Sequence, residues 1–509
     1  MKSRVLYTGK NVFWGYVSSL VTILLSFICR TAFIKTIGVG FLGINGLFTS
    51  VLGVLSLTEL GIGMAMNYSL YKPVAENDIE KIKSLMDVYK TAYRIVAFVV
   101  AGIGLVILPF LNVLVKGAEG IEHVRLYYLI FLFNTVSTYF VSYKYSLVNA
   151  DQKNYIISNI SAVFSVLMNF FQIFMLVAFK SYILYLVLQA TIQLIQKVYT
   201  AIFIDKHYPY LKDKNIKPLE KGEKNKIIGN VKALMLHKIG EISVNQTDNI
   251  IISAFINVST VGLVSNYTLI TNTVNQFVNI IFNGTIGSLG NLFASDDKEK
   301  QYRVFRTMDF ADFWIFSFSS VALFSLVQPF ISLMWGSQYR LPFAFLCLFI
   351  LNNYMVGQRI SVGNIKVAGG IFKQDKYLAL IQSVVNLGVS VLMAIKLGLV
   401  GVYIGTIVSG LIPSVLRPFI VYKNLFDKRA IEYYISYLFR LCLTAIMCFG
   451  GYLCVSAIMV DLSWLRFFIA VAVIGIVPNL ILLLFYFKSE EFKYLSSVAL
   501  SLLKRLRRR

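Results

Sequence analysis

Long apolar segments recur through the whole chain and leave little room for any other kind of fold. Each is at least as long as the ~20 residues that an α-helix needs to cross a bilayer. Backbone groups inside a membrane must be hydrogen-bonded within the protein, so helices are the expected structure. We therefore predict an all-α polytopic membrane protein with about 14 transmembrane helices. The segments lie near residues 11–36, 41–70, 88–115, 123–148, 155–179, 181–204, 227–255, 260–289, 307–335, 342–368, 377–396, 398–422, 430–458 and 463–487.

The composition supports a membrane protein and argues against the soluble classes. The 509 residues are 57% hydrophobic and 14% charged, and the mean hydropathy is +0.70, which soluble globular proteins do not reach. A net charge of +23 would suit a nucleic-acid partner, but the distribution of the charge argues against one. The five cysteines lie in apolar segments without metal-ligand spacing, and the three histidines are scattered. We therefore expect no nucleic acid, no metal and no organic cofactor.

The distribution of Lys and Arg predicts the orientation in the membrane. Cytoplasmic loops carry an excess of positive charge. With loops assigned alternately to the two sides, most of the 48 Lys and Arg fall on the side of the N-terminus. Both termini are therefore expected in the cytoplasm, which requires an even number of spans. Seven lie on the opposite side, namely Lys35, Lys116, Arg125, Lys180, Arg340, Lys396 and Arg466.

Loop length and charge divide the chain into five parts. The longest connection, 205–226, is strongly basic and lies close to the midpoint, so we interpret it as a cytoplasmic linker. It separates an N-terminal bundle of six helices, 1–204, from a second bundle of six, 227–422. Two further helices occupy 423–487. The tail, 488–509, is amphipathic with a basic end and is expected to lie on the inner leaflet.

The two halves of the chain repeat at a nearly constant offset. TIGVGFLGINGLFT at 36–49 aligns with FINVSTVGLVSNYT at 255–268, which places Gly43 on Gly262. Six spans separate the copies, so both halves enter the membrane in the same direction and are related by an axis along its normal. The repeat predicts two parallel bundles around a central cavity that opens to either side in turn. Further matches are Thr49 with Thr268, Met86-Asp87 with Met308-Asp309, Pro109-Phe110 with Pro329-Phe330, and Gly117 with Gly336.

Arg30 is a cation well inside the first apolar segment. Polar and small residues precede it at intervals of three to four, which places Arg30 at the end of one polar helix face. An ionisable residue within the membrane is costly and indicates a functional role. The alternative is that its long side chain reaches the headgroups from near the end of the segment. We predict that Arg30 contacts the substrate.

Polar faces also mark the segments that open each half. Polar residues between helices can simply hold the helices together, with each contact contributing less than about 2 kcal/mol. Faces on the leading segments of both halves instead predict a wetted cavity for a large hydrophilic solute, with Asn275 and Asn279 among its amide ligands. The faces comprise Asn45, Thr49, Ser56, Glu59 and Asn67; His237, Glu241, Asn245 and Asp248; Thr268, Asn272, Asn275, Gln276, Asn279 and Asn283; and Asn352, Arg359 and Lys366.

The charges within these segments indicate an anionic substrate. The predicted cavity cations are Arg30, Lys238, Arg359 and Lys366, and arginine holds phosphate or diphosphate through two hydrogen bonds. Lys238 and Glu241 lie one turn apart, so they can also neutralise each other.

The acidic residues suggest a coupling ion. Glu59, Glu241 and Asp248 are candidates for binding a coupling H⁺ or Na⁺, and Glu59 can alternatively pair with Arg30. Asp309 and Asp312 lie near the start of the ninth segment and are expected at the membrane interface.

The chain resembles Wzx-type polysaccharide flippases of the MOP (multidrug/oligosaccharidyl-lipid/polysaccharide) exporter superfamily, which also contains lipid II flippases and MATE drug exporters. The resemblance rests on fourteen spans in two halves, on the block FIKTIGVGFLGINGLFTSVLGVLSLTELGIGMAMNYSLYKP, and on TDNIIISAFINVSTVGLVSNY. Arg30 stands where lipid II flippases place an arginine thought to meet the diphosphate. The matching point of the second half is Asn249, so the arginine is not duplicated. We take Lys238 as the candidate cation of the second half in its place.

This resemblance implies a flippase rather than an enzyme. The implied substrate is an undecaprenyl-diphosphate-linked oligosaccharide, moved from the inner to the outer leaflet of the bacterial cytoplasmic membrane for capsule or other surface polysaccharide. Membrane lipid and other polysaccharide-assembly membrane proteins are the implied partners. Two alternatives remain open, a teichoic-acid-type precursor exporter and a MATE-like cation-coupled drug exporter. A polymerase or glycosyltransferase would need a larger outer loop than any present here.

Overall fold

The structure is a computed structural model that describes most of the chain. Its backbone is described for residues 20–59, 61–117, 120–213, 215–283, 289, 292–293, 297–371, 374–375 and 377–507. Within these ranges, side chains are not described for 58, 221, 226, 230, 232–245, 279–283, 498–499 and 501–507.

The described residues fold into helices joined by short turns, without a β-strand among them. Before the middle of the chain the helices are 20–36, α2 Val39–Leu55, η1 Ser56–Glu59, α3 Ile62–Ala75, α4 Ile79–Ile107, η2 Leu108–Phe110, α5 Leu111–Leu114, α6 Val124–Ala150, α7 Asn154–Phe179, α8 Tyr182–His207, η3 Pro209–Lys212 and α9 Lys221–Phe255. The later helices are α10 Val258–Asn283, α12 Lys298–Met334, η4 Ser337–Tyr339, α13 Phe343–Gly357, α14 Ile360–Ala368, α15 Leu378–Leu397, α16 Leu399–Val421, η5 Tyr422–Phe426, α17 Ile431–Ile458, α18 Trp464–Tyr486 and α19 Glu490–Arg507.

The predicted all-helical membrane fold is confirmed. Each of the fourteen predicted segments contains described helix, and ten helices within the described residues are long and apolar enough to cross a membrane. Among the described residues, three of these segments are interrupted, and in segment 88–115 the 3-10 turn η2 separates α4 from α5. Segment 41–70 breaks between α2 and α3, where Gly61 has a left-handed backbone with φ +80°, and segment 342–368 breaks at Gln358 and Arg359 between α13 and α14.

The internal repeat extends to the helix boundaries. The helices α2, α4 and α6 start at Val39, Ile79 and Val124, and α10, α12 and α13 start at Val258, Lys298 and Phe343. The offset between the two sets is the one that places Gly43 on Gly262. The caps repeat as well, because the side chain of Asp78 accepts from the Lys81 N–H and that of Asp297 accepts from the Lys300 N–H. Helices α17 and α18 follow the second copy.

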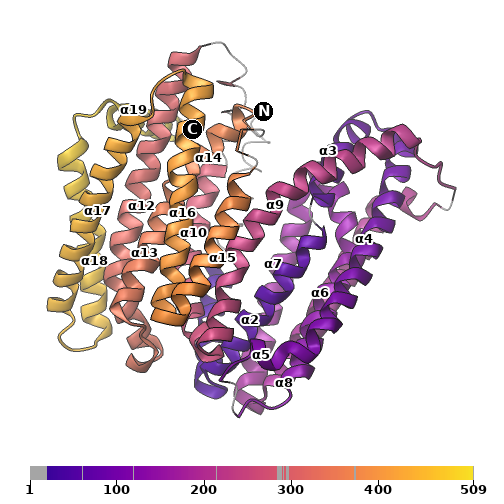
Figure 1. Cartoon of the computed structure of the whole chain (residues 1–509), viewed down its shortest axis with the longest axis horizontal. Helices are drawn as coiled ribbons and strands as arrows, with labels where there is room; N and C mark the ends of the chain where they lie inside the picture. The colour runs from indigo at the N-terminus through magenta and orange to yellow at the C-terminus, as the bar shows by residue number, and fades with distance from the viewer. Residues whose placement is uncertain are drawn as a thin grey trace. The chain divides into compact units, whose positions relative to one another are not determined.

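The chain forms two compact units, Met1–Gly262 (unit 1) and Leu263–Arg509 (unit 2). The predicted linker 205–226 lies within unit 1, and the division of the chain into five parts stays a prediction. The linker lies in unit 1 because α9, which begins at Lys221, packs on α2 and α3. In unit 1 the long helices α4, α6 and α8 lie side by side (Figure 1), and α7 packs on α8.

Repeat-related glycines pack against each other within unit 1. A Cβ atom on Gly43 would lie 1.8 Å from the carbonyl oxygen of Val258, and one on Gly262 would lie 2.2 Å from that of Val39. Val39 and Val258 are themselves equivalent positions of the repeat. Such reciprocal contact is the pattern that a two-fold axis produces. Small residues allow membrane helices to approach this closely.

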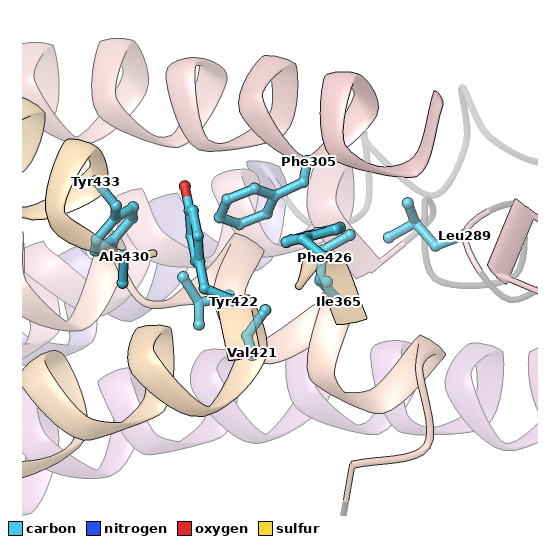
Figure 2. Close-up of a cluster of buried hydrophobic side chains, with 9 residues drawn as sticks. Leu289, Phe305, Ile365, Val421, Tyr422, Phe426, Ala430 and Tyr433 are labelled. Atoms are coloured by element: carbon cyan, nitrogen blue, oxygen red, sulfur yellow. The ribbon is translucent and has the colours of Figure 1, made fainter. Parts of the chain in front are cut away.

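Unit 2 is built around α12, which packs against α13, α14, α17, α18 and α19. At one end of α12, buried aromatic rings of Phe305, Tyr422, Phe426 and Tyr433 join helices α12, η5 and α17 (Figure 2). Ring centroids of Phe305 and Tyr422 lie 5.6 Å apart in an edge-on arrangement, which is favourable for aromatic pairs. This cluster anchors the segment that follows Arg417 at the end of α16.

Candidate binding residues inside the two units

Arg30 faces the interior of unit 1. Its guanidinium interacts electrostatically with Tyr185 of α8 and with the neighbouring Cys29. The Cys29 thiol donates to Gln172 Oε1 at 3.8 Å, and Gln172 Nε2 donates to Gln189 Oε1 at 3.2 Å. Arg30 thus lies among the amide and phenol groups of α7 and α8. Its role in substrate binding stays a prediction.

Glu59 lies in the break between α2 and α3. Its Oε1 accepts a hydrogen bond from the Tyr93 hydroxyl of α4 at 2.9 Å, so the structure gives it a phenol partner in place of the anticipated pairing with Arg30. Interrupted helices inside membrane proteins commonly carry ion or substrate sites. The proposal that Glu59 binds a coupling ion therefore stands as a prediction.

The polar face of α9 packs on α2. Asn249, the repeat counterpart of Arg30, donates from Nδ2 to Ser50 Oγ at 3.0 Å, and the Gln246 side chain lies against Gly53. Asp248 is half-buried next to these contacts. Three predicted site residues on α9 and α10 have side chains outside the described set, namely Lys238, Glu241 and Asn279.

Three cations of unit 2 share two neighbouring helices. Arg359 Nη1 donates to the Gly410 carbonyl oxygen of α16 at 3.2 Å. Lys366 Nζ lies 2.6 Å from Asp375 Oδ2, and Arg417 Nε lies 3.3 Å from the same oxygen. On each helix the two positions are separated by about two turns. The contacts between α14 and α16 therefore lie at two heights along the helices. Arg359 meets Gly410 at one height, and Lys366 and Arg417 share Asp375 at the other.

Arg359 and Arg417 are close enough for their charges to repel each other. Lys366 is buried in an ion pair with Asp375, which compensates its charge without a ligand. Arg359 instead contacts a backbone carbonyl, so its guanidinium keeps most of its five donors for another acceptor. These contacts favour Arg359 over Lys366 as an anion ligand.

The two amides Asn275 of α10 and Asn353 of α13 form a pair. Asn275 Nδ2 donates to Asn353 Oδ1 at 3.0 Å. Among the described residues, Asn275 Oδ1 and Asn353 Nδ2 are buried without a hydrogen-bond partner. A buried amide leaves such atoms unpaired only at a cost, so one acceptor and one donor are available here for a polar solute.

Asp309 and Asp312 have partners inside the protein, and their expected position at the membrane interface stays a prediction. Both side chains are buried, with 6% and 0% exposed. Asp309 Oδ2 lies 2.5 Å from Arg440 Nη1 of α17, and Asp312 Oδ2 accepts from the Ser361 N–H at 2.6 Å. Asp309 thus joins α12 to α17, and Asp312 caps the first turn of α14. The partners are distant in the sequence, so segment position alone did not reveal them.

Removing the Asp309 carboxylate is expected to destabilise the protein strongly. Asp309→Ala leaves Arg440 as an uncompensated buried charge, which costs about 3–5 kcal/mol, while Asp309→Ala with Arg440→Met should recover much of this loss. Thermal unfolding in detergent measures both. The control is Glu299→Ala, which breaks the exposed Glu299–Lys428 pair and should cost less than about 1 kcal/mol. Equal stability of the single Asp309 variant and wild type would contradict the proposed α12–α17 ion pair.

Sequence reasoning did not single out Arg417 or Lys197, two further cations inside apolar segments. Arg417 lies between two prolines of α16, Pro413 and Pro418, where no polar face was evident. Lys197 is preceded by Gln189, Gln193 and Gln196 on α8. That spacing is the same helical signal that marked the other polar faces, so it was available in the sequence.

The chain has the fold of MOP superfamily transporters. The lipid II flippase MurJ in an inward closed conformation matches with a TM-score of 0.64 at 15% identity, covering 93% of this chain and 99% of the flippase. An inward-facing MATE transporter of the MOP superfamily matches at 0.58 and 16% identity, covering 80% and 98%. The MATE transporter VcmN of Vibrio cholerae matches at 0.52 and 18% identity, covering 82% and 98%. No protein-family model and no curated protein matches the sequence.

Proposed function

We propose that this protein is a flippase for undecaprenyl-diphosphate-linked oligosaccharides. It moves the repeat unit from the inner to the outer leaflet by alternating access, for assembly of capsule or another surface polysaccharide. No covalent bond is made or broken, so the protein is not an enzyme. The likeness to a lipid II flippase supports a lipid-linked substrate, and the match to that flippase covers more of this chain than the matches to the MATE transporters do.

The observation that carries the proposal is the excess of positive charge between α14 and α16. Lys366 and Arg417 share the carboxylate of Asp375, and Arg359 lies close enough to Arg417 for their charges to repel each other. All three cations lie within helices long and apolar enough to span a membrane. Excess charge there is costly unless an anion is bound. A diphosphate carries enough negative charge to balance it and suits the planar guanidinium groups.

The remaining polar groups fit the rest of such a substrate. The available amide atoms of Asn275 and Asn353 can bind sugar hydroxyls through hydrogen bonds. Arg30 of unit 1 is the other predicted cation for the diphosphate, and the lipid tail stays in the bilayer. In this mechanism the protein binds and orients the polar headgroup and shields it from the hydrocarbon core of the membrane.

Complementation tests the function. The wild-type chain and Arg30→Ala are expressed at matched membrane abundance in a bacterium whose own polysaccharide flippase is deleted. We expect wild type to restore surface polysaccharide and Arg30→Ala to fail. Arg466→Ala is the control, because Arg466 forms a partly exposed ion pair with Asp461 near the start of α18.

Each outcome of this experiment has a meaning. Restoration by both chains keeps the function and removes Arg30 from the substrate path. If neither chain restores polysaccharide with a panel of repeat units while the protein lowers accumulation of a cationic dye, the drug-exporter function replaces this one. Restoration of teichoic-acid export alone reassigns the substrate.

A further inference from the structure

A lysine lies deep inside unit 1. Lys197 belongs to α8, and its side chain is only 9% exposed. It stands ten residues before the end of the helix at His207, or ~15 Å along the helix axis. A hydrocarbon core is about 30 Å thick, so Lys197 lies near the middle of the span.

The ammonium group of Lys197 contacts three neutral oxygens. Its Nζ donates to the Asn134 carbonyl oxygen at 2.6 Å, to Asn134 Oδ1 at 2.8 Å and to Ser137 Oγ at 2.9 Å. An ammonium has three donors, and each has an acceptor here. The charged form is therefore fully hydrogen-bonded, although none of these partners is a carboxylate.

The other buried lysines differ in this respect. Lys144 Nζ lies 2.6 Å from Asp205 Oδ1, and Lys366 Nζ lies 2.6 Å from Asp375 Oδ2. A carboxylate at that distance favours the charged lysine. Lys197 has no such partner within the described residues, so no opposite charge at contact distance holds its proton. Loss of one proton would leave a lone pair on Nζ facing these oxygens, and the Ser137 hydroxyl can turn to donate to it by giving up its bond to the Asn134 carbonyl oxygen. The site can therefore accommodate both forms.

The helices packed on α8 bring few charged groups toward Lys197. Helix α7 carries no Asp, Glu, Lys or Arg and faces α8 through Ser161 and Met168. Helix α6 contributes Tyr145, which interacts with Thr200, and Lys144. On α8 itself the nearest acid is Asp205, about two turns away. The first helix contributes Arg30 near Tyr185.

A polar path leads from Lys197 toward the predicted cytoplasmic end. Thr200 Oγ1 donates to the Gln196 carbonyl oxygen, and Lys144 Nζ reaches the Ala201 carbonyl oxygen at 3.5 Å as well as Asp205. Lys144 and Asp205 line a cavity of about 490 Å³. Its other lining residues include Lys83, Asp87, Lys90 and Tyr210. Water in this cavity would bring protons to within about two helical turns of Lys197.

Amide side chains continue in the other direction toward Arg30. Asn134 donates to Gln193, which lies one turn from Gln189 on α8. Gln189 accepts from Gln172, which in turn accepts from the Cys29 thiol beside Arg30. An anion bound at Arg30 would favour the charged form of Lys197, and by reciprocity a proton on Lys197 would favour anion binding.

We propose that Lys197 is a proton-binding site of unit 1, filled and emptied through the Lys144–Asp205 cavity. Its occupancy is coupled to binding of a diphosphate at Arg30. The proton site stands on the contacts of Lys197 alone, whereas the coupling rests on the proposed function. This places proton exchange on a lysine in addition to the acidic candidates Glu59, Glu241 and Asp248.

The proton site is tested without substrate by nitrogen NMR of the full chain carrying labelled lysine. Lys197→Arg and Lys144→Arg identify the two Nζ resonances by their loss. Ser137→Ala keeps Lys197 but removes one of its hydrogen-bond acceptors. A shift of the Lys197 Nζ resonance in this variant therefore confirms its assignment. We expect the Lys197 signal to change from ammonium to amine within the pH range in which the protein stays folded. A Lys197 signal that stays in one form across that range overturns the proposal.

The coupling is tested by adding undecaprenyl diphosphate to the detergent-solubilised protein in weak buffer with a pH indicator. Wild type should take up protons on binding, and uptake should be lost in Lys197→Arg, which stays charged, and in Lys197→Met, which stays neutral. Lys180→Arg, at the exposed C-terminal cap of α7, should behave as wild type. Titration of Lys197 without uptake in wild type would retain the proton site and overturn the coupling. Undiminished uptake in both Lys197 variants would also overturn it.

Discussion

Gly43→Val is expected to prevent accumulation of folded protein. A Cβ atom at position 43 would lie 1.8 Å from the Val258 carbonyl oxygen and 2.6 Å from its carbon. These are backbone atoms of α10, so no side-chain rotation relieves the clash and the two helices must separate. Overpacking in a well-packed core costs about 1–3 kcal/mol or more. Fluorescence-detected size-exclusion chromatography in mild detergent should show loss of the monodisperse peak.

Gly102→Val is the matched control for this variant. Gly102 lies inside α4, and a Cβ atom there would meet nothing within 4 Å. Its chromatographic peak should match that of wild type. Gly262→Val should reproduce the defect of Gly43→Val, because its Cβ would meet the Val39 carbonyl oxygen at 2.2 Å. A normal peak for the Gly43 and Gly262 variants would contradict the close crossing of α2 and α10.

Replacing Arg359 and Arg417 together with glutamine is expected to abolish transport while preserving the fold. Glutamine keeps hydrogen-bonding capacity but removes both charges that face the proposed diphosphate. A hydrogen bond to a charged group contributes about 1.5–3 kcal/mol, so loss of one or two should reduce transport at least ~10-fold. Surface polysaccharide in the complementation strain measures the effect, with thermal stability as the folding check.

A control for the charge effect lies at the same site. Lys366→Met combined with Asp375→Asn removes an internally compensated pair, so the net charge of the site changes little. This variant should retain more transport than the double arginine variant at comparable protein abundance. If both variants lose transport equally, local packing of α14 and α16 explains the result and the anion site is contradicted.

The sequence was sufficient to predict the helices and their repetition. Hydrophobic segments reflect a local requirement, because each crossing helix must satisfy its own backbone and face lipid. The repeat was visible for the same reason, since glycines such as Gly43 and Gly262 serve the same close approach in each half. The same offset also separates the helix N-caps Asp78 and Asp297. It extends to these residues because the local sequence sets where each helix begins.

The interruptions inside segments 41–70 and 342–368 were harder to predict. The apolar run 41–70 reads as a single span, yet η1 and Gly61 divide it, and Arg359 divides the run 342–368. Hydropathy averages over a window, whereas a helix break depends on the φ angle of one residue and on a capping partner elsewhere. Here the capping partner is Asp312, which accepts a hydrogen bond from the Ser361 N–H and lies 49 residues before Ser361 in the sequence.

The sequence by itself determined the membrane class, the helix positions and the presence of intramembrane charge. Only the tertiary structure decided what each charge contacts. It buried Asp309 against Arg440, 131 residues distant, and paired Lys366 with Asp375. It surrounded Lys197 with neutral oxygens of α6, which is a separate helix far earlier in the chain. The physical reason is that the energy of a buried charge depends on atoms within a few ångströms, and those atoms come from helices that are far apart in the sequence.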